Sequence, residues 1–254
     1  MSERLEGTVA LITGASSGIG ESTARELAEC GAAVAVVARR KDRLEQLAAE
    51  IERKGGRALV IAADVTDREQ ATAAVERTVV ELGRLDILVN NAGVMLLGPI
   101  TEAPVEEWER MVAINVMGLL YCTQAALPHL LAAAEAEPRR VADLVNISSV
   151  AGRKANAGSG VYNLTKFGVG AFSESLRMEL AKRHVRVSLV EPGFTKTELG
   201  DHIREEIQEW ARQRSVGIER LESEDIADAI AYVVTRPRRA AVSEVTVRPT
   251  EQEF

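Results

Sequence analysis

The sequence is poor in the residues that build disulfide frameworks and metal sites. It has two cysteines, Cys30 and Cys122, in segments of helical periodicity, and three histidines that lack the paired spacing of metal ligands. Two cysteines in helical segments are typical of small, reduced core residues in a protein of the reducing cytoplasm. We therefore expect no disulfide framework, no metal site and a cytoplasmic location.

Positive charge and long apolar runs are also scarce. The net charge is −7, whereas surfaces that bind nucleic acid or anionic membranes need clustered Lys and Arg. The most apolar long stretch, residues 113–134, is interrupted by polar residues such as Asn115 and His129, which favours a buried helix over a membrane span. The composition therefore argues against nucleic acid and membrane as partners.

The chain does contain a regular alternation of short apolar runs and amphipathic segments over 254 residues, without a linker-like break. The runs with strand character cover residues 7–13, 33–38, 57–62, 85–89, 144–147, 184–190 and 244–248. This alternation predicts an α/β fold, with a single domain over residues 1–254. We expect a doubly wound Rossmann-type parallel sheet of about seven strands with helices on both faces. Such sheets bind ligands at the carboxyl ends of their strands.

The first expected strand leads into a glycine-rich turn, Thr13-Gly-Ala-Ser-Ser-Gly-Ile-Gly20, which is followed by helical periodicity. A strand, a glycine-rich turn and a helix N-terminus form the context in which backbone N–H groups receive a pyrophosphate. The glycines Gly14, Gly18 and Gly20 have the spacing G-x-x-x-G-x-G. The position of the turn favours a dinucleotide site, with an ordinary turn as the alternative.

The second expected strand ends in Arg39 and Arg40. An acidic residue in this place would bind the ribose hydroxyls of NAD, and the sequence has none there. Guanidinium groups instead suit a 2′-phosphate through charge-assisted contacts. The pair predicts NADP(H), and the alternative is a solvated basic start of the next helix.

The stretch from Ser148 to Lys166 follows a buried strand and leads into an amphipathic helix. Tyr162 and Lys166 are four residues apart, so they lie one turn apart on the same helix face. A free tyrosine has a pKa of about 10, and a neighbouring cation lowers that pKa because it favours the phenolate. The pattern predicts a phenol that donates or accepts a proton, with a chance pairing as the alternative.

Two further polar features fall near the same edge of the predicted sheet. Asn90-Asn-Ala-Gly93 ends the fourth strand, either beside a ligand or as a simple turn. Asn115 lies in a long helical pattern, residues 106–134, as a satisfied core amide or as part of a site.

A charged helical segment, residues 201–215, carries Ile203, Ile207 and Trp210 at helical spacing. This pattern suits a lid that packs its apolar face over a cleft, and a plain surface helix explains it equally well. We expect the lid to cover about residues 195–215.

These motifs together resemble the short-chain dehydrogenase/reductase family over essentially the whole chain. The matches in order are TGASSGIG at 13–20, DVTD at 64–67, NNAG at 90–93, Asn115, ISS at 147–149, YNLTK at 162–166 and EPG at 191–193. The resemblance implies an NADPH-dependent oxidoreductase that reduces an aldehyde or ketone to an alcohol by hydride transfer. It also implies a small-molecule carbonyl or alcohol substrate and a homodimer or homotetramer.

The resemblance further implies roles for single residues. Ser149, thirteen residues before Tyr162, would bind the substrate oxygen, and Tyr162 would be the general acid or base. Lys166 would lower the pKa of Tyr162 and bind the nicotinamide ribose, and Asn115 would hold a water that links Lys166 to solvent. The implied cofactor contacts, from the pyrophosphate turn to the nicotinamide, are Gly14, Ser16, Gly18, Ile19, Gly20, Arg39, Arg40, Asp64, Val65, Asn91, Ala92, Gly93, Tyr162, Lys166, Pro192, Gly193, Thr195 and Thr197.

Within the family, segments such as NNAGVMLLGP and TELGDHI are similar to a branch of NADP-dependent enzymes that act on serine, 3-hydroxy acids or a β-lactam aldehyde. The ending departs from the glycine-rich end of oxoacyl-carrier-protein reductases. An NADP-dependent oxidation of a hydroxy acid or secondary alcohol is therefore the alternative activity. A cofactor-sensing regulator is a further alternative, although such a protein would be expected to lack one of the catalytic side chains. Residues 132–143 are expected to form a polar surface loop, and the shared motifs do not specify the substrate.

Overall fold

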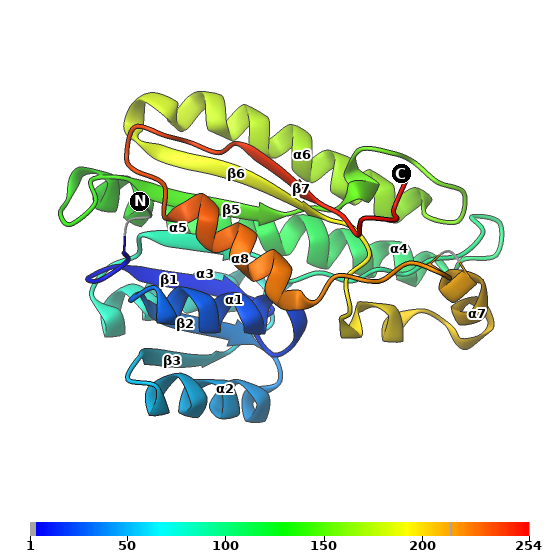
Figure 1. Cartoon of the computed structure of the whole chain (residues 1–254), viewed down its shortest axis with the longest axis horizontal. Coiled ribbons are helices and arrows are strands. Elements are labelled where there is room, and N and C mark those ends of the chain that lie inside the picture. Colours follow the sequence, from blue (N-terminus) through cyan, green and yellow to red (C-terminus); the bar gives the residue numbers. More distant parts are fainter. Residues whose placement is uncertain (1–3, 214, 254) are drawn as a thin grey trace.

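The structure is a computed structural model that describes residues 4–213 and 215–253. Within these residues, the centre is a seven-stranded sheet of order β3-β2-β1-β4-β5-β6-β7 with parallel neighbours throughout (Figure 1). The strands are β1 (Val9–Thr13), β2 (Ala33–Ala38), β3 (Arg57–Ala62), β4 (Ile87–Asn90), β5 (Ala142–Ile147), β6 (Val185–Pro192) and β7 (Glu244–Val247). The predicted fold class is confirmed.

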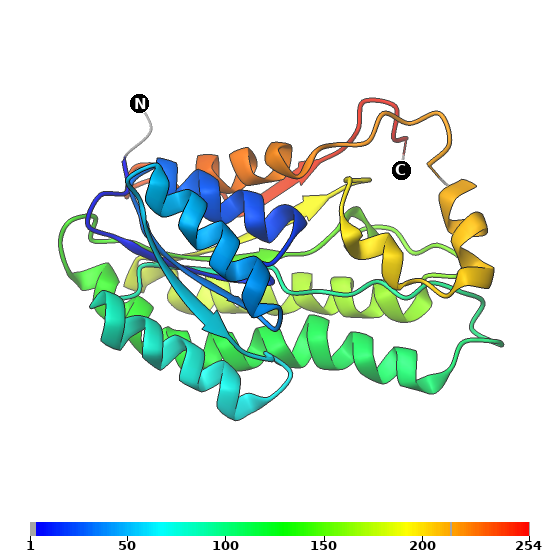
Figure 2. The ribbon, with the colours of Figure 1, turned by 90° about the horizontal axis from the view of Figure 1, so that it is seen from below.

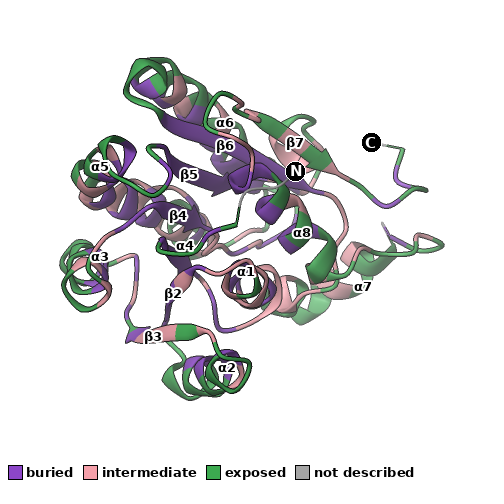
Figure 3. Cartoon of the chain, turned by 60° about the vertical axis from the view of Figure 1, so that its left-hand side comes forward, coloured by how far each residue is buried: buried purple, intermediate pink, exposed green. Residues whose placement is uncertain are grey.

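Helices cover both faces of this sheet, as Figure 2 shows. Apolar side chains of α1, α2 and α8 pack on one face, and those of α3, α5 and α6 pack on the other. The helices are α1 (Gly18–Glu29), α2 (Lys41–Arg53), α3 (Arg68–Leu82), α4 (Val105–Val112), α5 (Leu119–Glu135), α6 (Gly160–Leu180), α7 (Glu205–Gln213) and α8 (Ser223–Val234). Because both faces are covered, β4, β5 and β6 are buried along their whole length (Figure 3).

The strand order creates a switch point between β1 and β4. The chain runs outward from β1 through β2 to β3, then crosses to β4 and continues in the opposite direction to β7. At the carboxyl edge, the connections after β1 and β4 therefore diverge to opposite faces, which leaves a crevice. The phosphate turn and the Asn91–Gly93 segment both lie at this crevice.

The long apolar pattern after β4 forms a core helix. α4 and α5 are joined without interruption by one π-helical turn, Ala113–Gly118, which contains the buried Asn115. Within α5, Cys122 and Leu130 are each at most 2% exposed. The 31-residue helix Val105–Glu135 is long and apolar enough to cross a membrane, but these side chains pack against the sheet and α3 instead.

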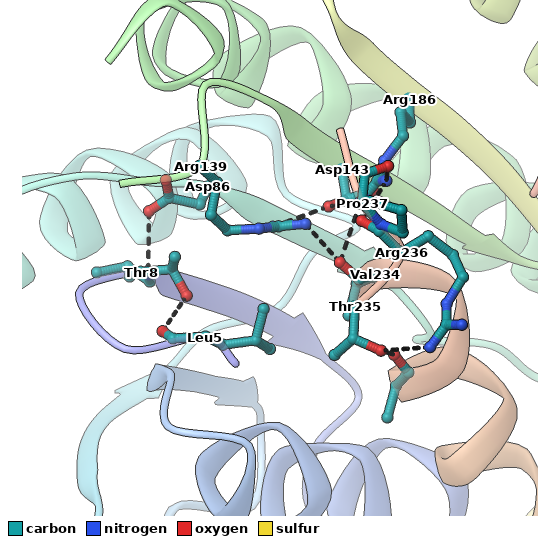
Figure 4. A network of polar contacts seen from close by, with 12 residues as sticks. Leu5, Thr8, Asp86, Arg139, Asp143, Arg186, Val234, Thr235, Arg236 and Pro237 are labelled. Carbon is teal, nitrogen blue, oxygen red and sulfur yellow. Dashed lines mark hydrogen bonds and ion pairs between the residues drawn. The ribbon is translucent and has the colours of Figure 1, made fainter. Parts of the chain in front are cut away.

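The expectation of a polar surface loop at residues 132–143 is wrong in part. α5 continues to Glu135 and β5 begins at Ala142, so the loop is shorter than expected. Arg139 and Asp143 are buried and form an ion pair of 3.0 Å, and Asp143 also binds Arg186 of β6 (Figure 4). Buried charges need partners of this kind, and the partner on β6 is distant in the sequence.

The segment after β6 covers the carboxyl edge of the sheet. It contains a short 3-10 helix, Glu198–His202, and then α7, which lies beside the α4 end of the molecule in Figures 1 and 2. Ile203 is buried, and Ile207 packs in the same apolar cluster as Val94 and Tyr162. Of the three apolar residues predicted to face the cleft, Ile203, which precedes α7, lines it, Ile207 packs in the cluster behind it and Trp210 is partly exposed. Position 214 lies outside the described residues.

Candidate active site

The phosphate turn between β1 and α1 is fitted against the segment after β4. Asn91 Nδ2 donates to the carbonyl oxygens of Thr13, at 2.9 Å, and Gly14, at 3.3 Å. Gly14 has a φ of +67°, and a Cβ there would lie 2.8 Å from Ala92 Cα. A larger residue would separate the two segments, so Gly14 is required by both backbone conformation and space.

Two arginines stand at the end of β2 in different surroundings. Arg39 is largely exposed, with its Nη1 4.0 Å from Asp64 Oδ2. Arg40 reaches back to the phosphate turn and donates to Ser16 Oγ at 3.0 Å and to Ser17 Oγ at 2.8 Å. Its Nη1 lies 2.8 Å from Glu198 Oε2, a carboxylate of the segment after β6. Both guanidinium groups thus line the same end of the cleft.

The buried strand β5 and helix α6 bring Ser149, Tyr162 and Lys166 together. Ser149 precedes a short 3-10 helix, Val150–Gly152, and its hydroxyl accepts from Ala151 N at 3.1 Å and lies close enough to the Tyr162 phenol to lower the pKa of that group. Lys166 Nζ donates to the carbonyl oxygen of Ile147 at 2.9 Å and lies 5.8 Å from the centre of the Tyr162 ring. The helical spacing of Tyr162 and Lys166 predicted this juxtaposition, and the end of β5 supplies the serine.

The pKa values of this pair differ from expectation. Burial raises the pKa of Tyr162 to about 12, against a smaller lowering by the Ser149 hydrogen bond. Burial also lowers the pKa of Lys166 to about 8. The pKa of the Tyr162 phenol thus moves opposite to the lowering expected from Lys166, because the loss of water on burial is the largest influence on it. The Tyr162 phenol therefore keeps its proton at neutral pH.

Asn115 lies behind the wall of the cleft, and its amide forms hydrogen bonds on both its oxygen and its nitrogen. Its Oδ1 accepts from Val94 N at 2.8 Å, and its Nδ2 donates to Val94 O at 2.9 Å and to Thr165 Oγ1 at 3.2 Å. The π-helical turn that carries Asn115 is a local widening often found at functional sites. A Cβ at Gly93 would lie 3.4 Å from Asn115 Oδ1 and 3.9 Å from Lys166 Nζ, so Gly93 keeps the space between them open.

The stretch Glu191–Thr197, at the end of β6, forms one wall of the cleft. A Cβ at Gly193 would meet Gln252 Oε1 at 2.2 Å, and that same oxygen accepts from Phe194 N at 3.0 Å. Thr197 Oγ1 accepts from Leu199 N at 3.3 Å, and its methyl carbon packs against Gly18 of the phosphate turn. The end of the chain and the phosphate turn thus both contact this stretch.

The predicted site residues line one cleft of about 540 Å³, with two exceptions. Asn115 and Gly20 lie behind the wall, where Gly20 packs against the Gly14 carbonyl group. The cleft offers a glycine turn without side chains, basic groups at one end and hydroxyl groups at the other. These features fit a nicotinamide dinucleotide.

The sequence interpretation gave no role to two cleft residues, Gln252 and Glu198, or to Asn163, which supports a loop at the cleft. Gln252 comes from the last residues of the chain, and Glu198 pairs with an arginine more than 150 positions earlier. Asn163 binds the carbonyl oxygens of Ala151 and Lys154 and so shapes the loop before α6. No local pattern marked these residues, apart from the position of Asn163 directly after Tyr162.

Comparison with known proteins agrees with the geometry. Residues 8–208 match the family model described as short chain dehydrogenase. An uncharacterized oxidoreductase of Staphylococcus saprophyticus is 38% identical over 247 residues, which are 96% of this chain and 98% of that protein. A glycine betaine reductase of Emericella nidulans is 39% identical over 98% of this chain, but the chain spans 19% of the length of that relative.

Solved structures show the same fold with cofactors bound. A metagenomic short-chain oxidoreductase in complex with NADP is 34% identical, with a TM-score of 0.81 over 97% of this chain and 99% of that one. A serine dehydrogenase with NADP+ is 32% identical, with a TM-score of 0.86 over 97% of each chain. A 3-ketoacyl-(acyl-carrier-protein) reductase of Brucella melitensis with NADH is also 32% identical, with a TM-score of 0.83 over 96% and 98% of the two chains.

The cleft at the switch point and the matched relatives lead to one conclusion: this chain belongs to the short chain dehydrogenase family and is an NAD(P)-dependent oxidoreductase.

Proposed function

We propose that the protein reduces an aldehyde or ketone to an alcohol with NADPH. The observation that carries this proposal is the buried phenol of Tyr162, which lines the cleft together with the nearby Ser149 hydroxyl. A carbonyl oxygen held between these two hydroxyl groups would receive a proton from Tyr162 as its carbon is reduced. The bound cofactor would supply the hydride.

The protonation state of the phenol is the one that reduction requires. With a pKa of about 12, Tyr162 holds its proton at neutral pH. Reduction consumes a proton at the new alcohol, whereas oxidation needs a base to remove one. Lys166, beside the ring, would orient the cofactor ribose and return protons to Tyr162, and Asn115 would connect Lys166 to solvent through a water.

NADP(H) is the proposed cofactor because β2 ends in two arginines without an acidic residue. Arg39 and Arg40 both line the end of the cleft next to the phosphate turn. Arginine binds a phosphate through paired charge-assisted contacts. Similar structures hold NADP in most of the complexes and NADH in one, so both cofactors belong in the test.

A second activity, the oxidation of a hydroxy acid, is favoured by positive charge in the lining of the cleft. Lys154, Arg212 and Arg220 line the cleft in addition to the two arginines after β2. Their positive charge suits a substrate carboxylate, and a serine dehydrogenase is among the similar structures. The segment at residues 195–215, which carries Arg212, would act as the lid over such a substrate.

We further propose that the enzyme is cytoplasmic and works as a homodimer or homotetramer. Leu164 and Phe167 are large apolar side chains exposed on α6, the helix that also carries Tyr162. Burial of such side chains between copies would hold this helix rigid. Two reduced cysteines are consistent with the cytoplasm.

Nicotinamide absorbance with a panel of neutral aldehydes, ketones and hydroxy acids tests the proposal, with NADPH, NADH and their oxidised forms in parallel. We expect NADPH to be consumed in the reduction of one class of carbonyl compound. A Tyr162→Phe variant should bind NADPH normally but turn over about 10²- to 10⁴-fold more slowly. Faster turnover with hydroxy acids and NADP+ would favour the second activity. Tight NADPH binding without turnover of any of these compounds would contradict both.

A further inference from the structure

One ion pair at the cofactor end of the cleft joins two segments that are far apart in the chain. Arg40 Nη1 lies 2.8 Å from Glu198 Oε2, and the two side chains are 44% and 40% exposed. Glu198 stands at the start of the predicted lid, directly after Thr197, which packs against the phosphate turn at Gly18. The contact therefore joins the end of β2, beside the phosphate turn, to the base of the lid.

The carboxylate of Glu198 is held in this position by more than one group. Arg40 lowers the pKa of Glu198 through a hydrogen bond and its charge, and the nearby Ser17 hydroxyl lowers it further. Arg43 adds a second positive charge nearby. Glu198 thus places a full negative charge at the end of the cleft where basic residues would receive a phosphate.

The orientation of Arg40 does not depend on Glu198. Its Nε and Nη2 donate to Ser16 Oγ at 3.2 and 3.0 Å, and Nη2 also donates to Ser17 Oγ at 2.8 Å. These contacts come from the phosphate-turn side and would keep the guanidinium group in the cleft without the carboxylate. Removal of the Glu198 charge therefore frees Arg40 without misplacing it.

We propose that Glu198 is a specificity-determining residue whose carboxylate competes with the 2′-phosphate of NADP(H) for Arg40. The inference rests on the cofactor end assigned under the proposed function. A 2′-phosphate carries nearly two negative charges at neutral pH, so it must either displace Glu198 from Arg40 or bind beside a like charge. NAD(H) lacks this phosphate and leaves the ion pair intact. Glu198 thereby reduces the preference for NADP(H) below that of the arginines alone.

Equilibrium binding of two fragments tests the proposal without turnover. Adenosine 2′,5′-bisphosphate and adenosine 5′-monophosphate differ only in the 2′-phosphate, and calorimetry measures both on wild type and Glu198→Gln. We expect the variant to bind the bisphosphate about fivefold more tightly, the size of one exposed ion-pair interaction, and the monophosphate equally well. NADPH and NADH, followed by fluorescence, should show the same contrast.

Three controls separate competition from a structural effect. Glu206→Gln removes another carboxylate of the predicted lid, paired with Arg204 at 2.7 Å outside the cleft, and should leave both affinities unchanged. In an Arg40→Ala background, Glu198→Gln should give no gain, because the shared partner is gone. The gain should also shrink at about 1 M salt, where exposed charges are screened.

An unchanged or weaker affinity of Glu198→Gln for the bisphosphate would overturn the proposal. This result would mean that Glu198 is neutral or that it supports Arg40. A wild type that binds NADH at least as tightly as NADPH would instead contradict the proposed cofactor. In that case a fivefold gain in Glu198→Gln would still support competition for Arg40.

Discussion

Lys166 is a cation that the fold holds away from water beside a buried phenol. Its side chain has one protein hydrogen bond in this site, to the carbonyl oxygen of Ile147 at 2.9 Å. No carboxylate offsets its charge among the described ion pairs. Burial therefore lowers its pKa from the ordinary 10.5 to about 8. The residue reduces the stability of the free protein, as expected for a functional group that a ligand satisfies.

The pH dependence of stability follows from this shift. Between pH 8 and 10.5 the unfolded chain holds a proton on Lys166 that the folded protein has released. Stability from this residue therefore rises with pH across that interval, by up to about 3 kcal/mol. We therefore expect the free energy of unfolding of the wild type to rise relative to that of Lys166→Met as the pH increases from neutral toward 10.

Urea denaturation of the ligand-free proteins at several pH values measures the difference. Lys182→Met, at an exposed position, is the matched control, and its free energy of unfolding should change with pH in the same way as that of the wild type. A constant difference between wild type and Lys166→Met from neutral to alkaline pH would show that the fold does not depress the pKa of Lys166.

At the scale of elements, a close contact joins α7 to the loop before α6. Trp210 packs against Gly158, where a Cβ would clash with Trp210 Cη2 and lie 2.9 Å from Trp210 Cζ2. Gly158 has a φ of +74° and its carbonyl oxygen accepts from Gly98 N at 2.9 Å. The loop before α6, the segment after β4 and α7 thus meet at one glycine.

Gly158→Ala should displace α7 without disturbing the cofactor end of the cleft. We expect a KM for the carbonyl substrate at least about tenfold higher, because the lid no longer closes in the same place, and an unchanged affinity for NADPH. Steady-state kinetics and fluorescence titration measure the two values.

Gly55→Ala is the control for backbone strain alone. Gly55 has a φ of +86°, and no atom lies within 4 Å of a Cβ placed there. That variant should lose some stability and keep its KM. Equal KM values for Gly158→Ala and wild type would mean that the contact with Trp210 does not position α7.

At the scale of the whole molecule, a buried ion network ties the amino edge of the sheet together. Asp143 of β5 accepts from Arg186 Nε at 2.7 Å and from Arg139 Nη1 at 3.0 Å (Figure 4). Arg186 also donates to the carbonyl oxygens of Val234, the last residue of α8, and of Arg236, two residues later. This edge is opposite to the one that carries the cleft, so the network stabilises the fold at a distance from the chemistry.

Asp143→Asn should therefore lower stability while sparing catalysis. The change leaves two buried guanidinium groups without their carboxylate, at a cost of about 3–5 kcal/mol. The free energy of unfolding should fall by this amount, and kcat/KM of the folded enzyme should stay within about twofold of wild type. Denaturation curves and steady-state rates check the two expectations.

Glu174→Gln, which removes an exposed partner of Arg177, is the matched control and should leave unfolding unchanged. A large loss of kcat/KM in folded Asp143→Asn would show that the amino edge is coupled to the cleft.

The sequence by itself was enough to predict a parallel sheet of about seven strands and the family. Apolar runs and amphipathic segments are local patterns, and the strands β2 and β3 have the predicted ends. The motif at Tyr162 and Lys166 also depends on local helical spacing, so its side chains fall on one face in the structure. Their roles in catalysis and cofactor binding stay predictions for the experiments above.

Only the tertiary structure decided the features that depend on contacts between distant segments. The raised pKa of Tyr162 follows from the water that surrounding elements exclude, which no spacing along the chain expresses. The pairing of Asp143 with Arg186 and of Arg40 with Glu198 likewise depends on which segments the fold brings together. Desolvation and long-range pairing are properties of the packed molecule, and for that reason they could be known only from its three-dimensional arrangement.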